Sequence, residues 1–295
     1  MQKIIPHLWF DKEAVEAAEF HTSVFPGSKI THKSRIKDTP SGDCDILGFK
    51  IMGHDFMSIS AGPYFKINPS ISFFVNFDPS HDKNAKKNID IIWKKLSEDG
   101  KVLMPLDKYP WSERYGWIQD KYGVSWQLIL TNPEGEDRPL IIPSLLFVGD
   151  KHGKAEEAVR FYLSVFKNSK LGNMMHYGPG QEPNKEGTVM FSDFMLENNW
   201  FAAMDGGGKH DFKFNEAVSF MVNCKDQKEI DYYWNKLSAV PESEQCGWLK
   251  DKFGVSWQIV PEEMGELMKK SPKKVTEAFL KMKKFDIETL RKAAK

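Results

Sequence analysis

The chain has 295 residues, of which 41% are hydrophobic and 28% are charged, and 41 basic residues balance 41 acidic ones. This length and composition predict two compact globular units with substantial cores. The balanced charge provides no overall positive field to attract a phosphate backbone, so nucleic acid is not an expected partner.

The first half of the chain predicts two similar cycles of elements. A strand at IIPHLWF precedes a helix at KEAVEAAEFHTSVF, which Pro26 and Gly27 terminate, and strands follow at ILGFKIM and DFMSIS. The second cycle has the strand SISFFVNF, the helix DKNAKKNIDIIWKKLSEDG, and the strands VLMPL, YGWIQD and VSWQLIL. Each cycle predicts a βαβββ module, in which a helix and several strands follow an opening strand.

The second half repeats the first. Ile5–Ile30 resembles Ile142–Leu171, which carries a four-residue insertion, and residues 65–76 resemble residues 212–223. The segment GWIQDKYGVSWQL returns as GWLKDKFGVSWQI. Similar segments in the same order predict a duplicated architecture, and therefore four βαβββ modules in all.

Composition also predicts the domain boundaries. The segment TNPEGEDRPL interrupts the strand and helix patterns with Pro, Gly and acidic residues. We therefore expect one domain at residues 1–132, a linker at 133–139 and a second domain at 140–261. Residues 262–295 are rich in Lys and carry apolar residues at helical spacing, which predicts a helical tail packed on the body.

The repeated DKYG and DKFG segments lie between predicted strands and indicate turns. Asp120 and Asp251 can bind their own backbone, and Gly123 and Gly254 can adopt a positive φ. These four residues are expected to be structural.

A fourfold βαβββ chain whose domains end in D-x-x-G-x-x-W-Q resembles the vicinal oxygen chelate superfamily of glyoxalases, bleomycin-resistance proteins and extradiol dioxygenases. More narrowly, PHLWFDKEAVEAAEFHTSVFPGSKI, EGTVMFSDFML and GWLKDKFGVSWQIVP resemble its PhnB-like branch, often labelled 3-demethylubiquinone 3-methyltransferase-like. The resemblance covers nearly all of the chain except the tail. It implies an α+β fold of two tandem glyoxalase-like domains, with four βαβββ modules, curved mixed sheets and a C-terminal helical tail.

The resemblance also implies that paired modules form cups with helices outside and a ligand inside. Strand alternation puts Trp126 and Leu128 on the face expected to pack against helices, and Gln127 on the cup face. The same alternation places further polar and aromatic residues of other strands on the cup face. The candidate ligand-binding residues are His7, Trp9, Ser72, Asn76, Gln127, Ser219, Asn223 and Gln258.

Each candidate also has a structural interpretation. Serine and asparagine near strand ends often satisfy only backbone groups, and a single histidine on an apolar strand is often structural. Tryptophan side chains could line a pocket for a flat ligand or could complete cores. The tryptophans in question are Trp9, Trp111, Trp117, Trp200 and Trp248.

The resemblance implies where metal ligands would lie in metal-using relatives. The matching positions are His7 and Ser144 on the opening strands, Ser72 and Ser219 on the mid-domain strands, and Gln127 and Gln258 on the closing strands. An open catalytic metal site normally has about three strong ligands, and only His7 is clearly one. We therefore expect a metal-free cup, in which His7, Gln127 and Gln258 are the weak metal candidates.

Two ways of pairing the modules remain open. If the chain mimics a superfamily dimer, module one shares a cup with module four, and His7 lies near Ser219 and Gln258. If each half forms its own cup, His7 instead faces Ser72 and Gln127.

The first functional hypothesis is a small-molecule binding protein, or an enzyme whose reaction stays open, with a metal-free cup. The alternative is a divalent-metal-dependent lyase or dioxygenase. In a third hypothesis the second half, with Ser144 in place of His7, has lost its ligand. Methyl transfer is not expected, because no strand is followed by the Gly-rich loop of a doubly wound domain.

The cysteines and the first residues indicate the compartment. Cys44, Cys224 and Cys246 are odd in number and lack CxxC spacing, which favours a reduced, cytoplasmic setting. The N-terminus reaches acidic residues too early for a signal peptide, and no apolar run is long enough to span a bilayer. We expect no membrane partner, and either a monomer that mimics a superfamily dimer or a homodimer.

Overall fold

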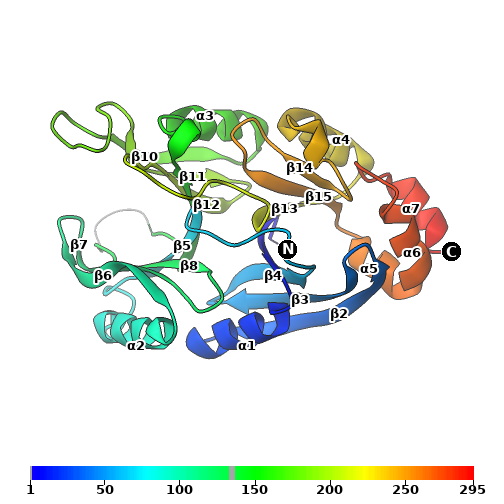
Figure 1. Ribbon diagram of the computed structural model, residues 1–295, viewed down its shortest axis with the longest axis horizontal. Coiled ribbons are helices and arrows are strands. Elements are labelled where there is room, and N and C mark those ends of the chain that lie inside the picture. Colours follow the sequence, from blue (N-terminus) through cyan, green and yellow to red (C-terminus); the bar gives the residue numbers. More distant parts are fainter. Residues whose placement is uncertain (1, 133–136) are drawn as a thin grey trace.

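The structure is a computed structural model, and it describes residues 2–132 and 137–295. Residues 133–136, which make up part of the predicted linker, lie outside the described residues. Two curved sheets occupy the centre of the molecule (Figure 1), with α1 and α2 along one side and α3 and α4 along the other. No described helix is both long and apolar enough to cross a membrane.

The first half forms two βαβββ modules. Module one consists of β1 (Ile4–Phe10), α1 (Ala14–Val24), β2 (Lys29–Thr39), β3 (Gly42–Ile51) and β4 (His54–Ser60). Module two consists of β5 (Ile71–Phe77), α2 (Ala85–Ser97), β6 (Lys101–Tyr109), β7 (Ser112–Gln119) and β8 (Ser125–Leu130). Strand β2 was not predicted. It is an edge strand whose side chains are mostly exposed, so its sequence lacks the apolar alternation that identifies a half-buried strand.

The second half repeats this order with one difference. Module three consists of β9 (Ile141–Phe147), the 3₁₀-helix η1 (Gly149–Lys151), α3 (Ala155–Val165), β10 (Lys170–His176), β11 (Val189–Leu196) and β12 (Asn199–Asp205). Module four consists of β13 (Val218–Cys224), α4 (Gln227–Leu237), the 3₁₀-helix η2 (Pro241–Ser243), β14 (Trp248–Lys250) and β15 (Ser256–Pro261). Module four is therefore βαββ rather than the predicted βαβββ. The chain between its helix and its penultimate strand is too short for the additional strand that β6 provides in module two.

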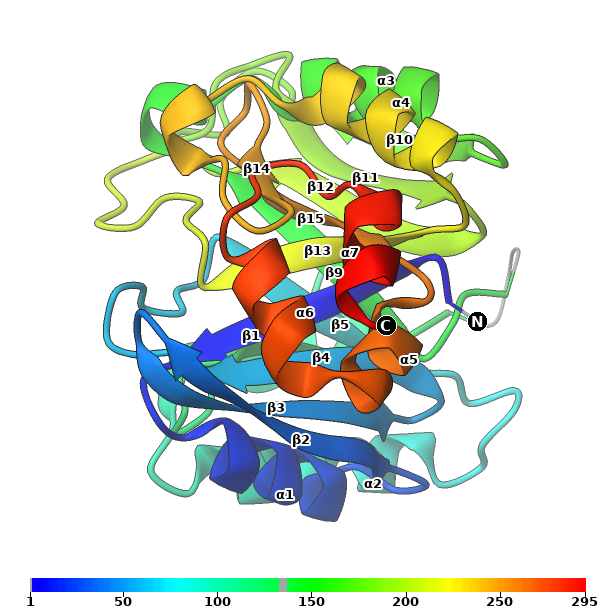
Figure 2. The ribbon, with the colours of Figure 1, turned by 90° about the vertical axis from the view of Figure 1, so that its right-hand side faces the viewer.

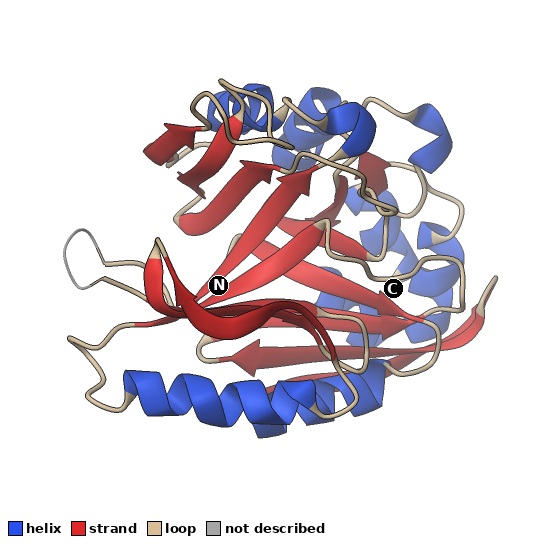
Figure 3. Cartoon of the chain, turned by 60° about the vertical axis from the view of Figure 1, so that its left-hand side comes forward, coloured by secondary structure: helices blue, strands red, loops and turns tan. Residues whose placement is uncertain are grey.

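The two halves are joined by their opening strands. Strand β1 pairs antiparallel with β13, and β5 pairs antiparallel with β9. The result is a seven-stranded sheet of order β14-β15-β13-β1-β4-β3-β2 and an eight-stranded sheet of order β10-β11-β12-β9-β5-β8-β7-β6. Module one thus shares a sheet with module four, and module two with module three, which is the first of the two arrangements predicted from the sequence. We call the concave faces of these sheets the seven-stranded cup and the eight-stranded cup; Figure 3 shows the curvature.

Helices α1 to α4 pack against the outer faces of the sheets, and the buried apolar side chains form one large core. Trp126 and Trp257, predicted to face helices, are almost fully buried in this core. The Trp126 indole N–H donates to Asp120 Oδ2 at 2.8 Å, and the Trp257 indole donates to Asp251 Oδ2 at the same distance. The repeated segment therefore joins a turn to the core through a hydrogen bond from tryptophan to aspartate.

Each aspartate also holds the turn and one helix. Asp251 Oδ1 accepts the backbone N–H groups of Phe253 and Val255, and its Oδ2 accepts the hydroxyl of Tyr162 on α3 at 2.7 Å. Asp120 has the same turn bonds, and its Oδ2 lies 2.6 Å from Nε2 of His21 on α1. The following glycines have φ values of 84° and 92°, so these turns need residues without a Cβ.

The C-terminal tail forms α5 (Met264–Lys270), α6 (Pro272–Phe279) and α7 (Ile287–Ala293). Helix α6 contacts β2 at one edge of the seven-stranded sheet. Near the other edge, the carbonyls of Met282 and Lys283 accept the backbone N–H groups of Cys246 and Gly247, directly before β14. Figure 2 shows the tail in front of β1, β4 and β13, so the tail spans the seven-stranded cup from edge to edge.

Replacing Asp251 with alanine should destabilise the fold by about 3 kcal/mol or more, because four buried donors lose their acceptor. Urea denaturation measures the loss. Asp226→Ala is the control, since Asp226 caps α4 through a single exposed bond to the N–H of Glu229, worth about 1 kcal/mol. Equal losses in the two variants would contradict the role assigned to Asp251.

Candidate functional site

The seven-stranded cup brings together four of the predicted site residues, three of them at its floor. His7 on β1 lies directly opposite Ser219 on β13, and Gln258 Nε2 on β15 donates to Ser219 Oγ at 3.0 Å. On its other side, His7 neighbours Met57 of β4. The floor of this cup therefore combines an imidazole, a hydroxyl, an amide and a thioether, contributed by modules one and four.

His7 is a buried, neutral histidine. Its side chain contacts the ring of Trp248 edge to face at 5.6 Å, and its Nδ1 has no hydrogen-bond partner among the described residues. Burial lowers the pKa of His7 to about 4, because a charged imidazole would lose its hydration there. The imidazole can therefore accept or donate a hydrogen bond at neutral pH without carrying charge.

Trp9 lies two residues further along β1 and completes the aromatic part of this cup. Its ring lies 5.9 Å from that of Trp248, and its indole N–H donates to the carbonyl of Gly62 at 2.8 Å. A groove of about 230 Å³ lies beside Trp9 at the end of β1, lined also by Phe65 and Tyr122. The tail crosses the cup itself, so this cup is covered by the chain's own C-terminus.

The eight-stranded cup contains a chain of three hydrogen-bonded side chains. The hydroxyl of Tyr115 on β7 donates to Gln127 Oε1 on β8 at 2.6 Å, and Gln127 Nε2 donates to Ser72 Oγ on β5 at 2.8 Å. Burial raises the pKa of Tyr115 well above its usual value, so the phenol keeps its proton. Ser72 lies directly opposite Ser144 of β9, which is fully buried.

Apolar side chains from both halves surround this polar chain. They form a hydrophobic cluster separate from the main core. Its buried members are Phe74, Tyr115, Ile142, Trp200 and Ala202, and the partly buried side chains against them are Met104, Tyr109, Trp117, Ile129, Phe191, Met195 and Met204. Aromatic and methionine side chains thus make up most of the cup wall.

An ion pair holds one side of that wall. The guanidinium of Arg138 lies 3.7 Å from the centre of the Trp200 ring, and its Nε donates to Asp193 Oδ2 at 2.8 Å. Asp193 Oδ1 also accepts the backbone N–H of Asn173 on the edge strand β10. These contacts fix the orientation of the Trp200 ring at the second half's side of the cup.

The remaining two candidates bind backbone. Asn76 Nδ2 donates to the carbonyl of Pro139, and Asn223 Nδ2 donates to the carbonyl of Gln2. Each amide therefore binds the segment that precedes the opening strand of the other half. Asn76 and Asn223 thus occupy equivalent places at the junctions between the two halves.

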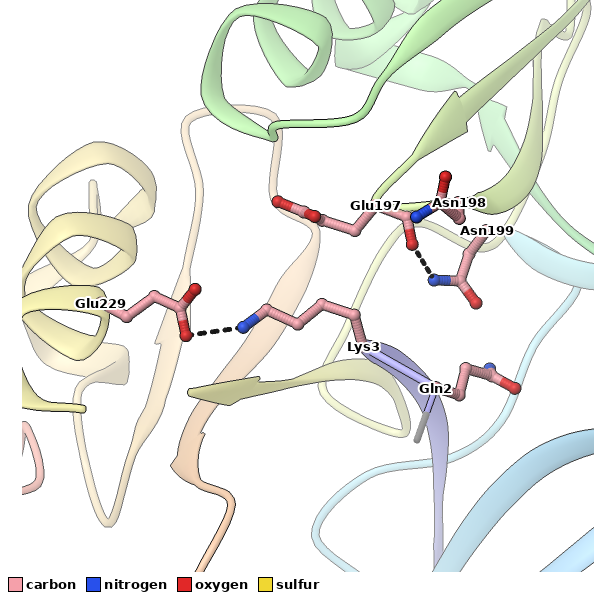
Figure 4. Close-up of a pocket in the computed structure, with 6 residues that line it drawn as sticks. All are labelled: Gln2, Lys3, Glu197, Asn198, Asn199 and Glu229. Atoms are coloured by element: carbon pink, nitrogen blue, oxygen red, sulfur yellow. Dashed lines mark hydrogen bonds and ion pairs between the residues drawn. The ribbon is translucent and has the colours of Figure 1, made fainter. Parts of the chain in front are cut away.

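Two polar features lie outside the cups. Asp78, His81 and Asp137 place their ligand atoms within 4.8 Å of one another, and His81 and Asp137 are exposed. A pocket of about 410 Å³ lies between the start of β1, the β11–β12 turn and α4, lined by Gln2, Lys3, Glu197, Asn198, Asn199 and Glu229. Figure 4 shows that Lys3 points to Glu229 and bonds it at 2.6 Å. The cup residues take part in neither feature.

Tyr115, Ser144 and Trp200 contribute more to the eight-stranded cup than the sequence indicated. Tyr115 was not a candidate, and Ser144 was considered only as the counterpart of His7. The alternation in YGWIQ places Tyr115 and Trp117 on one strand face, and this signal could have identified Tyr115.

Two curved sheets, each built from paired modules with helices outside, are characteristic of the glyoxalase fold. Glyoxalase I from Zea mays matches with a TM-score of 0.56 and 13% identity, covering 90% of this chain and 96% of that one, which establishes the likeness of fold. A family model described as 3-demethylubiquinone-9 3-methyltransferase matches residues 2–129 and 139–260. The chain belongs to this family.

Among solved structures, a PhnB protein from Bacillus cereus is 37% identical; the match covers 44% of this chain and all of that one, with a TM-score of 0.39. A comparison with curated proteins gave no match. The matched ranges are consistent with the duplication detected in the sequence, since the family model matches the chain twice.

The buried His7 should make stability depend on pH. The unfolded chain binds a proton at His7 below pH 6.5, whereas the folded chain does so only near pH 4. The contribution of neutral His7 to the free energy of unfolding is therefore fully present above pH 6.5, and about 3 kcal/mol of it is lost as the pH falls toward 4. Urea denaturation at several pH values should show a smaller decrease for His7→Gln.

His54→Gln is a second variant of the same kind, because burial also lowers the pKa of His54 to about 4. The two single variants should each remove part of the pH dependence, and the double variant more than either. An unchanged pH dependence in His7→Gln would show that the pKa of His7 is not lowered in the folded chain.

Proposed function

We propose that the protein binds a small, largely apolar organic molecule in the eight-stranded cup, without a metal ion. The observation that carries this proposal is the separate cluster of aromatic and methionine side chains around the Tyr115–Gln127–Ser72 chain. Ligand pockets are typically lined by apolar side chains with a few polar groups that fix orientation. Both carriage of a metabolite and catalysis on it are compatible with such a site.

The two cups differ in what covers them. The tail spans the seven-stranded cup, and its side chains Val275, Phe285 and Leu290 are buried. The wall of the eight-stranded cup instead contains many partly buried methionine and aromatic side chains. Methionine is flexible and polarizable, so these side chains can adapt to an apolar ligand. This contrast supports the eight-stranded cup as the ligand site.

The donor groups of both cups favour a metal-free site over the lyase or dioxygenase alternative. In the eight-stranded cup the matching positions carry Ser72, Ser144 and Gln127, and the amide nitrogen of Gln127 already points to Ser72. In the seven-stranded cup, His7 is accompanied only by neutral Ser219 and Gln258 and by Met57. Divalent ions in open catalytic sites prefer several imidazole or carboxylate ligands.

The family description names a methyltransferase, but the proposal does not include methyl transfer. Methyltransferases that use S-adenosylmethionine usually have a doubly wound parallel sheet with a Gly-rich loop after the first strand. Both sheets here mix parallel and antiparallel pairs. We therefore propose a binding site of the glyoxalase type.

A neutral fluorescent dye, N-phenylnaphthylamine, tests the location of the site. Titration should shift the methionine methyl NMR signals of Met104, Met195 and Met204, which lie at the eight-stranded cup, and not that of Met221 in the other cup. The variant Ala202→Phe adds a ring to the cup floor and should weaken dye binding about tenfold or more.

Met57→Phe is the control, because Met57 occupies the equivalent position in the seven-stranded cup, and it should leave dye affinity unchanged. The methionine spectrum of each dye-free variant reports whether it is folded. Dye binding that shifts only Met57 and Met221, or that survives Ala202→Phe, would contradict the proposal.

Metal content provides a separate test. Protein purified without chelator or histidine tag should contain much less than one equivalent of divalent metal by plasma mass spectrometry. Near-stoichiometric metal that is lost in His7→Ala would instead support the metal-dependent alternative in the seven-stranded cup.

A further inference from the structure

Two serines lie opposite each other at the floor of the eight-stranded cup. Ser72 of the first half and Ser144 of the second lie directly opposite each other in the antiparallel pair of β5 and β9. Opposite side chains in such a pair are near neighbours on one sheet face. Both serines are buried, with exposed fractions of 1% and 0%.

The direction of the hydrogen-bond chain determines what Ser72 can offer. Tyr115 donates to the Gln127 carbonyl oxygen, and the Gln127 amide donates in turn to Ser72 Oγ. Ser72 Oγ is thus an acceptor in this chain, and its own proton remains for donation. The chain therefore ends on a hydroxyl donor at the cup floor.

Ser144 offers a second donor at the same place. Its Oγ is buried and has no hydrogen-bond partner among the described residues. Buried hydroxyls are normally hydrogen-bonded, because leaving one unpaired costs free energy. A ligand atom that accepts hydrogen bonds from both hydroxyls would satisfy Ser144 and complete the chain from Tyr115.

The surrounding groups restrict the chemistry of that atom. A carbonyl oxygen has two lone pairs and no proton, so it suits two converging donors. A carboxylate would be less suitable, because both donors are neutral and the guanidinium of Arg138 on the cup wall is bound to Asp193. The aromatic rings of Phe74 and Trp200 favour a flat apolar body.

We infer that the ligand is a planar aromatic compound whose carbonyl oxygen accepts hydrogen bonds from the hydroxyls of Ser72 and Ser144. The inference rests on the proposed function, since it specifies the ligand class of the same cup. It also distinguishes the two cups, because in the seven-stranded cup the position of Ser144 is taken by His7.

Fluorenone and fluorene form a matched pair of probes, because they share a flat ring system and differ in one carbonyl group. Titrations of the full chain, followed by methionine methyl NMR, should show fluorenone binding about tenfold more tightly than fluorene, with shifts at Met104, Met195 and Met204. Ser144→Ala and Ser72→Ala should each remove most of this preference by weakening fluorenone binding.

Ser219→Ala is the matched control, since Ser219 accepts the Gln258 amide in the seven-stranded cup just as Ser72 accepts that of Gln127. It should leave the preference for fluorenone intact. The spectra of the probe-free variants establish that each is folded.

The outcomes separate this inference from the proposed function. Equal affinity for the two probes in the eight-stranded cup would overturn the carbonyl assignment and leave the cup as an apolar site. A preference that persists in both serine variants would overturn the role of the hydroxyls. If N-phenylnaphthylamine binds in the eight-stranded cup but fluorenone and fluorene do not, the inferred ligand class is wrong. If none of the three compounds binds there, the proposed function is wrong as well.

Discussion

The antiparallel pairing of the opening strands is the constraint on which the rest of the structure depends. Because β1 pairs with β13 and β5 with β9, each sheet takes one module from each half of the chain. Neither half can form its own cup in this arrangement. The residues that meet at each cup floor are therefore far apart in sequence, as Ser72 and Ser144 illustrate.

Duplication within one chain allows the two cups to diverge. Both retain a glutamine that donates to a serine, Gln127 to Ser72 and Gln258 to Ser219. The seven-stranded cup has one strand fewer and is spanned by the tail, whereas the eight-stranded cup has Tyr115 as a third member of its hydrogen-bond chain. Because each cup is built by both halves, the hypothesis that one half has lost its ligand has to be restated as a difference between the two cups.

Much of the fold could be predicted from the sequence, because its signals are local. Strand alternation correctly placed Trp126 on the core face of its strand and Gln127 on the opposite face. The Asp and Gly pattern correctly identified the two turns. Strand β2 was missed because an exposed edge strand has no buried face to impose apolar alternation.

The site was less predictable, because it depends on contacts between distant segments. The choice between the two module pairings could not be made from local patterns, since both use the same strands. The place of Ser144 in the site depends on the pairing of β9 with β5, and that of Trp200 on its contact with Arg138. Hydrogen bonds such as that from Asn76 to Pro139 depend equally on this long-range pairing.

The central claim is that one cup of this duplicated chain is the ligand site. Anomalous diffraction from crystals soaked with a bromofluorenone tests it most directly, because the bromine locates the ligand without assumptions about its pose. The account predicts one bromine peak per chain, within the eight-stranded cup beside Phe74 and Trp200. A peak of equal height in the seven-stranded cup beneath the tail, or peaks only outside both cups, would contradict it.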